Sequence, residues 1–294
     1  MWSMLLLHGP NAMAEKSLPE LTMGFYRPVI REVPRQDVEI SMRFWLEELG
    51  RSGDLNLRPV QFYDDLDTMK SDADAGIIQF MVASAMGFAQ KFSPKDLADG
   101  TSGFKSRPNE LLMVVRREAK IRTIADLAGK RIALLTDDEL TDIYLETLLM
   151  KTWVKADWSR LGTVVRDSRS SKLVHRLFFN DADAAFLYSS AYDVAVSLNP
   201  QIGQRLQVLD EYSFKTRSPY TALFTSRTPP DMREQFINVA VNMQGTPRGK
   251  QVLQIYQTDL MDKSYVTDLK PYWDLLTVHR TLKTVTASAD KKKR

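Results

Sequence analysis

The chain alternates apolar strand-like segments with helix-like segments, and it does so twice. Residues 37–49 carry an apolar stripe at helical spacing between two short apolar runs, and the same order returns after residue 110. The predicted strands are residues 21–25, 58–62, 76–80, 110–115, 131–135, 163–166, 184–188, 206–209 and 220–225. Strands that alternate with helices form a mostly parallel sheet with helices on its faces. An alternation that restarts in mid-chain predicts an α/β protein of two lobes.

The composition excludes several classes of protein. The 294 residues carry a net charge of +3, so no overall field favours nucleic acid as a partner. No apolar run approaches the roughly 18 residues of a membrane span, so we expect no direct membrane insertion. The chain has no cysteine, which excludes disulfides and thiolate metal sites.

Patterns of catalytic residues are missing as well. The sequence has no Gly-rich nucleotide loop, no Walker loop, no nucleophile elbow and no zinc-protease motif. The three histidines, His8, His175 and His279, are far apart along the chain. We therefore expect a protein that is not an enzyme and that binds neither a metal nor a cofactor.

The two ends of the chain differ from the rest. Residues 1–7 are apolar, and the tripeptide AMA at residues 12–14 has the small-x-small form of a signal-peptidase site. Residues 1–14 are interpreted as the remnant of a secretory signal peptide, with a disordered cytosolic N-terminus as the alternative. Residues 286–294 end in the sequence KKKR and are expected to form a disordered basic tail.

Three regions of the chain resemble type II periplasmic binding proteins. These proteins enter their second lobe through an apolar strand and a D-L-x-G-K-x-[IV]-[AG] pattern, which corresponds to ELLMVVRRE at residues 110–118 and IRTIADLAGKRIALL at residues 121–135. A later helix, strand and loop are similar to LFFNDADAAFLYSSAYDVAV at residues 177–196. The segment MQGTPRGKQVLQIY at residues 243–256 resembles the ending of the phosphate/phosphite/phosphonate-binding branch of ABC importers.

The resemblance implies two α/β lobes joined by two crossover strands, with a ligand cleft between them at the carboxyl ends of the strands. Lobe one would be residues 20–113 plus 224–285, and lobe two residues 114–223, with crossovers near residues 113–115 and 220–224. The implied function is that of the solute-binding component of an ABC importer. Such a protein is exported to the periplasm, captures a small molecule by hinge closure and delivers it to a permease. The alternative is a ligand-sensing partner of a membrane signalling receptor.

The turn after residues 131–135 differs from the resembled branch. There a Ser/Thr/Gly-rich turn binds the oxyanion, whereas this chain has Thr136, Asp137, Asp138 and Glu139. Thr136 and Glu139 have the spacing of a capping box, in which side chains satisfy the helix N-terminus. The favoured interpretation is this cap, and a direct ligand role for the turn stays open. In both cases the anion clamp of the branch is not retained.

The loops that follow predicted strands supply the other candidates for the ligand site. The full set is Tyr26, Arg27, Ser84, Thr136, Asp137, Tyr188, Ser189 and Tyr220. For Tyr188 and Tyr220 the alternative is a half-buried aromatic side chain. Carboxylates attract ammonium groups and aromatic faces attract cations, whereas Arg27 suits a carboxylate. The preferred ligand is therefore an amine-bearing or neutral polar molecule, or a zwitterion, rather than a doubly charged phosphonate.

Overall fold

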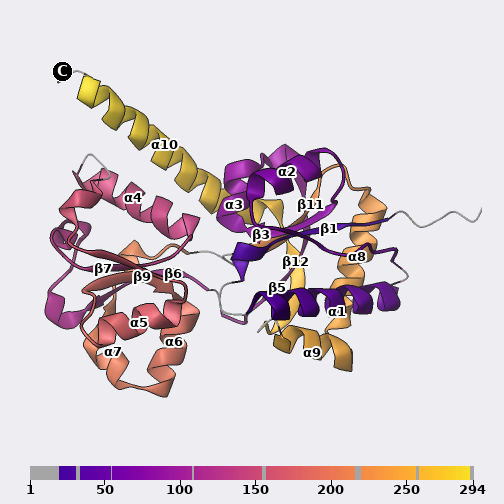
Figure 1. Cartoon of the computed structure of the whole chain (residues 1–294), viewed down its shortest axis with the longest axis horizontal. Helices are drawn as coiled ribbons and strands as arrows, with labels where there is room; N and C mark the ends of the chain where they lie inside the picture. Colours follow the sequence, from indigo (N-terminus) through magenta and orange to yellow (C-terminus); the bar gives the residue numbers. More distant parts are fainter. Residues whose placement is uncertain are drawn as a thin grey trace, which may run out of the picture.

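A computed structural model describes residues 20–30, 34–53, 55–107, 109–153, 157–215, 220–255 and 258–291. The predicted signal-peptide remnant, residues 1–14, lies outside these ranges. Figure 1 shows two sheets side by side, each covered by helices, with one long helix running from one half of the molecule to the other. The predicted α/β fold of two lobes is confirmed.

The first lobe is built on the sheet β2-β1-β3-β11-β4 and on the two-stranded sheet β12-β5. Strands β1, β2 and β3 are parallel, and β11 is antiparallel to β3. The strands are β1 (Met23–Tyr26), β2 (Gln61–Tyr63), β3 (Phe80–Ser84), β4 (Leu97–Ala98), β5 (Gly100–Phe104), β11 (Tyr220–Thr225) and β12 (Leu260–Ser264). The helices are α1 (Arg35–Gly53), α2 (Leu66–Asp74), α3 (Ala85–Lys91), α8 (Pro230–Met243) and α9 (Pro247–Ile255).

The second lobe is built on the sheet β10-β6-β9-β7-β8, in which β7 is parallel to both β8 and β9. Its strands are β6 (Leu111–Arg116), β7 (Ile132–Leu135), β8 (Val164–Asp167), β9 (Ala184–Tyr188) and β10 (Leu206–Val208). Its helices are α4 (Glu139–Trp153), α5 (Ser170–Phe178), α6 (Ser189–Leu198) and α7 (Gln201–Arg205). Strands β7 and β9 are buried almost throughout, as their continuous apolar runs predicted.

The chain passes between the two sheets earlier than the sequence indicated. Residues 113–115 lie inside β6 of the second sheet, and residues 220–224 lie inside β11 of the first. The passages are therefore residues 105–110 and the segment between Phe214 and Tyr220. Backbone hydrogen bonds join the places where the passages meet the second sheet, from Leu111 N, at the start of β6, to Phe214 O and from Phe214 N to Leu111 O. Both strands are mostly apolar, so their composition does not reveal where sheet pairing begins.

The last helix, α10 (Lys270–Lys291), packs against α3 of the first lobe and α4 of the second (Figure 1). It extends to Lys291, so residues 286–291 of the tail that was expected to be disordered are helical. A helix that has already formed extends at low cost, because each further residue adds one backbone hydrogen bond, and a basic composition does not prevent this. Within the described residues, no helix is both long and apolar enough to cross a membrane.

The buried side chains form three clusters. One belongs to the first lobe and includes Trp45, Phe80 and Phe236, and another belongs to the second lobe. The third contains Phe88 of the first lobe and Phe186 of the second, so it runs through both. The two lobes therefore share part of their hydrophobic core.

Candidate functional site

Two parallel strands of each lobe end at or next to candidate residues. In the first lobe, β1 ends at Tyr26 and β3 at Ser84. In the second, β9 ends at Tyr188, and Thr136 directly follows β7. The carboxyl ends of parallel strands meet at one edge of a sheet, so the structure gathers these residues at one edge of each lobe.

A polar pair joins the two edges. The Tyr26 hydroxyl donates a hydrogen bond of 3.4 Å to Oε1 of Glu139, across 113 positions of sequence. Tyr26 is 8% exposed and belongs to the cluster that runs through both lobes. The acid-rich turn of the second lobe therefore lies at the end of the first strand of the other lobe.

The acid-rich turn is capped differently from the prediction. Helix α4 begins at Glu139, and Oδ1 of Asp138 accepts a hydrogen bond of 3.3 Å from the backbone N–H of Thr141. The predicted capping box of Thr136 with Glu139 is therefore wrong, because the N-cap residue is Asp138, two positions later. Asp137 has a φ of 52°, a left-handed conformation that interrupts a helix and that aspartate tolerates. Thr136 instead donates its N–H to Asp167 O at 2.9 Å, which extends the pairing of β7 with β8.

Carboxylates remain concentrated along the start of α4. Burial raises the pKa of Asp142, and the neighbouring carboxylates of Asp138 and Glu146 add to this effect. Arg166 opposes it, because its guanidinium donates to Asp142 Oδ1 at 2.7 Å and to Leu135 O at 2.9 Å. This arginine is thus engaged in supporting the turn.

Arg27 lies directly after β1, and acids of its own lobe surround its guanidinium. Its Nη1 donates to Oδ2 of Asp64 at 2.6 Å, and its Nε lies 3.5 Å from Oε1 of Glu39. The same group stacks over the ring of Phe62, with 5.3 Å from Cζ to the ring centroid. The positive charge predicted for ligand binding is therefore already balanced by two carboxylates.

Ser84 and Tyr220 are neighbours in the sheet. They are paired in register between β3 and β11, and Ser84 Oγ accepts a hydrogen bond of 2.9 Å from the N–H of Gly87 at the start of α3. Burial raises the pKa of the Tyr220 hydroxyl. Tyr220 thus remains a neutral group able to donate a hydrogen bond at physiological pH.

Tyr188 and Ser189 connect β9 to the passage between the lobes. The Tyr188 N–H donates to Ser170 Oγ at 3.5 Å, and Ser189 Oγ accepts from the N–H of Glu110 at 3.0 Å. Asn109 also contributes, because its Oδ1 accepts from the N–H of Ser190 at 3.1 Å. Sequence reasoning missed Asn109, since nothing in its local pattern marks it as the partner of a helix about 80 residues later.

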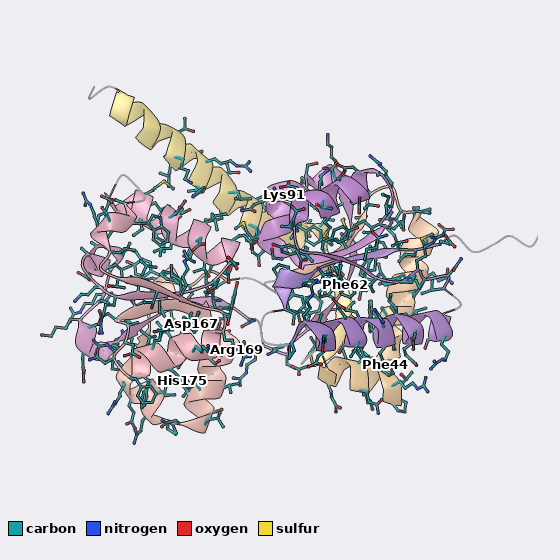
Figure 2. The ribbon with its side chains drawn as sticks, in the orientation of Figure 1. Phe44, Phe62, Lys91, Asp167, Arg169 and His175 are labelled. Carbon is teal, nitrogen blue, oxygen red and sulfur yellow. The ribbon has the colours of Figure 1, made fainter. Side chains whose placement is uncertain are left out.

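Sequence reasoning also missed Arg169, which follows β8. Figure 2 labels it with Asp167 on the side of the second lobe that is nearest the first. Its side chain is exposed, and the described part of the chain contains no hydrogen bond or ion pair to its guanidinium. Arg169 is therefore a cation at the same edge as the acid-rich turn.

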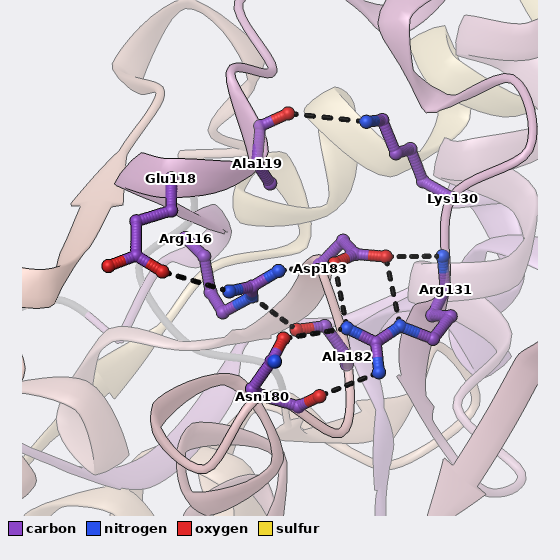
Figure 3. Close-up of polar contacts among 8 residues, drawn as sticks. All are labelled: Arg116, Glu118, Ala119, Lys130, Arg131, Asn180, Ala182 and Asp183. Atoms are coloured by element: carbon purple, nitrogen blue, oxygen red, sulfur yellow. Dashed lines mark hydrogen bonds and ion pairs between the residues drawn. The ribbon is translucent and has the colours of Figure 1, made fainter.

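Asp183, within the segment 177–196, has a structural role. Figure 3 shows Asp183, at the amino end of β9, between two arginines. It accepts hydrogen bonds from Arg116 Nη2 at 2.7 Å and from Arg131 Nη2 at 2.9 Å. The Arg131 hydrogen bond, joined by that of Arg116, holds the pKa of Asp183 well below its usual range despite partial burial. This cluster joins β6, β7 and β9 at the edge opposite Tyr188.

Among the residues with described placement, no three His, Asp or Glu side chains are arranged to bind a metal ion. The site consists instead of hydroxyls, carboxylates, one exposed guanidinium and aromatic rings. Such groups hold a small polar molecule by hydrogen bonds and charge.

Known structures share this architecture. A binding protein component of an ABC phosphonate transporter from Pseudomonas aeruginosa superposes with a TM-score of 0.61 at 11% identity, covering 92% of this chain and 89% of that one. A protein from Prochlorococcus marinus in complex with methylphosphonate gives 0.61 at 11% identity, covering 90% and 98%. A protein from Xanthomonas citri bound to ATP gives 0.65 at 12% identity, also covering 90% and 98%. At these identities the likeness shows the fold.

Sequence comparison identifies the family. No curated protein sequence matches the chain significantly. The family model described as ABC transporter, phosphonate, periplasmic substrate-binding protein matches residues 44–264, which is most of the chain. The match spans both sheets, including the turn at residues 136–139. The chain therefore belongs to the phosphonate family of periplasmic substrate-binding proteins of ABC transporters.

Proposed function

We propose that this protein captures a small zwitterionic molecule between its two lobes in the periplasm and delivers it to an ABC permease. The observation that carries the proposal is the Tyr26–Glu139 contact, which brings the acid-rich turn of one lobe against the strand end of the other. A ligand enclosed there would contact both lobes, as hinge closure requires.

The charges at these edges favour an amino group in the ligand. Asp137 is exposed, Glu139 faces Tyr26, and carboxylates form strong charge-assisted hydrogen bonds with ammonium groups. A dianion 4 Å from a carboxylate would instead be repelled by about 4 kcal/mol per charge pair at an effective dielectric constant of 20. The acid-rich turn therefore supports an amine-bearing ligand over a simple phosphonate.

Other groups would hold the anionic end of the ligand. Arg27 is balanced by Asp64 and Glu39, so it contributes little net attraction. Arg169 supplies an exposed positive charge, and Tyr188 and Tyr220 supply aromatic surface and hydroxyls at the neighbouring strand ends. One carboxylate or phosphonate group can be accommodated by these residues when the ligand also carries an amine.

Isothermal titration with three compounds tests the proposal. Methylphosphonate and aminomethylphosphonate differ only by the amino group, and glycine replaces the phosphonate by a carboxylate. We expect the amino compounds to bind more tightly than methylphosphonate, and small-angle scattering to show compaction with the compound that binds. Micromolar binding of methylphosphonate, with no gain from the amino group, would contradict the proposal.

A further inference from the structure

Helix α10 connects the lobes in addition to the two chain passages. It follows β12 of the first lobe, and its first turns bury Tyr272, Leu275 and Leu276 in the cluster shared by both lobes. It packs against α3 on the first lobe and α4 on the second (Figure 1). Any rotation of one lobe relative to the other must therefore move α10 against at least one of these helices.

The contact of α10 with the second lobe converges on Glu146 of α4. His279 Nε2 lies 2.8 Å from Glu146 Oε2, and Lys283 Nζ lies 3.1 Å from the same oxygen. The indole N–H of Trp158 donates to Oε1 at 3.4 Å. The His279 side chain is only 9% exposed. Glu146 is thus a partly buried carboxylate with partners from α10 and from the segment that follows α4.

Aromatic packing joins this contact to the passage between the lobes. The ring of Phe214 lies 5.3 Å from that of Tyr144 on α4 and 5.5 Å from that of Tyr272 on α10. Phe214 also pairs through its backbone with Leu111, the residue at which the other passage enters β6. Phe214, next to a passage between the lobes, is therefore packed against both α4 and α10.

Helix α4 transmits this contact to the candidate ligand site. Glu139 is its first residue, and Glu146 lies seven residues later, two turns or about 10 Å along the axis and on nearly the same face. Glu139 contacts Tyr26 of the first lobe, whereas Glu146 is bound by α10. The first residue and the middle of one helix are thus held by elements that the first lobe supplies.

We propose that His279 is a positioning residue, whose contact with Glu146 fixes the placement of α4 and thereby holds the turn at residues 136–139 against Tyr26. Its consequence for ligand affinity rests on the function proposed above. The positioning itself is a property of the free protein and can be measured without a ligand.

Hydrogen exchange of the full chain tests this inference. In His279→Ala we expect amides of residues 136–142 and of residues 26–30 to exchange about tenfold faster, while the central strands β3 and β9 keep their protection. The matched control is Lys270→Ala, which removes an exposed ion pair with Asp274 on the same helix without touching α4. We expect this control to exchange like the wild type at both segments.

A conservative variant separates positioning from loss of folding. His279→Gln keeps a side-chain N–H donor toward Glu146, so it should restore most of the protection at residues 136–142. If His279→Ala does not fold, Glu146→Gln, which weakens the same contact from the other side, replaces it in the comparison. Faster exchange confined to α10, with residues 136–142 unchanged, would overturn the inference. Because no ligand is present, this outcome is independent of whether the proposed zwitterion binds.

Discussion

The hydroxyl of Tyr26 lies 3.4 Å from Oε1 of Glu139, and this hydrogen bond connects the end of β1 in one lobe to the first residue of α4 in the other. Tyr26 comes from a strand in the middle of its sheet, flanked by β2 and β3. Glu139 comes from the turn whose carboxylates distinguish the chain from an oxyanion clamp. The pair therefore marks where the lobes approach each other and which charge a ligand meets there.

Removing the Tyr26 hydroxyl should loosen the approach of the lobes. For Tyr26→Phe we expect a loss of about 1 kcal/mol in the free energy of unfolding, the net value of one hydrogen bond, and a larger radius of gyration in small-angle scattering. The matched control is Tyr63→Phe, because the Tyr63 hydroxyl donates to Asp72 at 2.7 Å within the first lobe. The control should lose stability without a change in radius. Equal radii for all three proteins would show that the pair does not hold the lobes together.

The Glu139 carboxylate should select the charge of the ligand. In Glu139→Gln we expect methylphosphonate to bind at least tenfold more tightly and aminomethylphosphonate at least tenfold more weakly, because a charge interaction of up to about 4 kcal/mol is removed. Isothermal titration measures both constants. The control is Asp231→Asn, which removes an exposed charge on α8 of the first lobe. If Glu139→Gln and the control behave alike, net charge rather than the turn governs affinity.

The cap of α4 can be assigned by two alanine variants. Asp138→Ala removes the side chain that accepts from Thr141 N, and we expect it to cost about 1 kcal/mol in thermal or denaturant unfolding. Thr136→Ala should cost much less, because the observed role of Thr136 is a backbone hydrogen bond to Asp167. If Thr136→Ala costs more stability than Asp138→Ala, the capping box predicted from the sequence is correct.

Asp183 should stabilise the second lobe in a pH-dependent manner. Its pKa is lowered chiefly by the hydrogen bond from Arg131, aided by Arg116, so its contribution is complete at pH values above the ordinary value near 4. It begins to decline once the pH falls below that value, and it is lost as the pH falls through the depressed pKa of the folded state. Asp183→Asn, which leaves two arginines without their carboxylate, should lower the free energy of unfolding at neutral pH by about 2–3 kcal/mol.

The pH profile of unfolding checks this assignment. The difference between wild type and Asp183→Asn should be constant from pH 6 to 8, on the order of the neutral value, and should shrink below about pH 4. Asp181→Asn is the control, since Asp181 is an exposed neighbour two residues away. A difference that grows on acidification would mean that Asp183 is not the carboxylate that the arginines stabilise.

The sequence by itself determined the alternation of strands and helices, the division into two α/β lobes and the family. The alternation and the two lobes follow from local patterns, because an apolar run flanked by turns is buried wherever it occurs, and a helical stripe needs only one apolar surface to pack on. The family follows from the resemblance of whole segments to known proteins. The same patterns placed Tyr26 directly after one predicted strand and Tyr188 at the end of another, whereas β3 ends at Ser84, four residues beyond the strand predicted at residues 76–80. Their participation in ligand binding stays a prediction, as does that of Arg27, Thr136, Asp137, Ser189 and Tyr220.

The tertiary structure alone decided which charges are already paired and which helix joins the lobes. Arg27 is balanced by Asp64, 37 positions away, and Glu146 is hydrogen-bonded to His279, 133 positions away. Such partners depend on the angles at which helices cross sheets, and no local pattern encodes those angles. The cap also shifts from Thr136 to Asp138, because Asp137 adopts a left-handed conformation between β7 and α4 and the helix begins only after it. An ion pair is specified by the positions of two chain segments in space, whereas a strand is specified by its own residues.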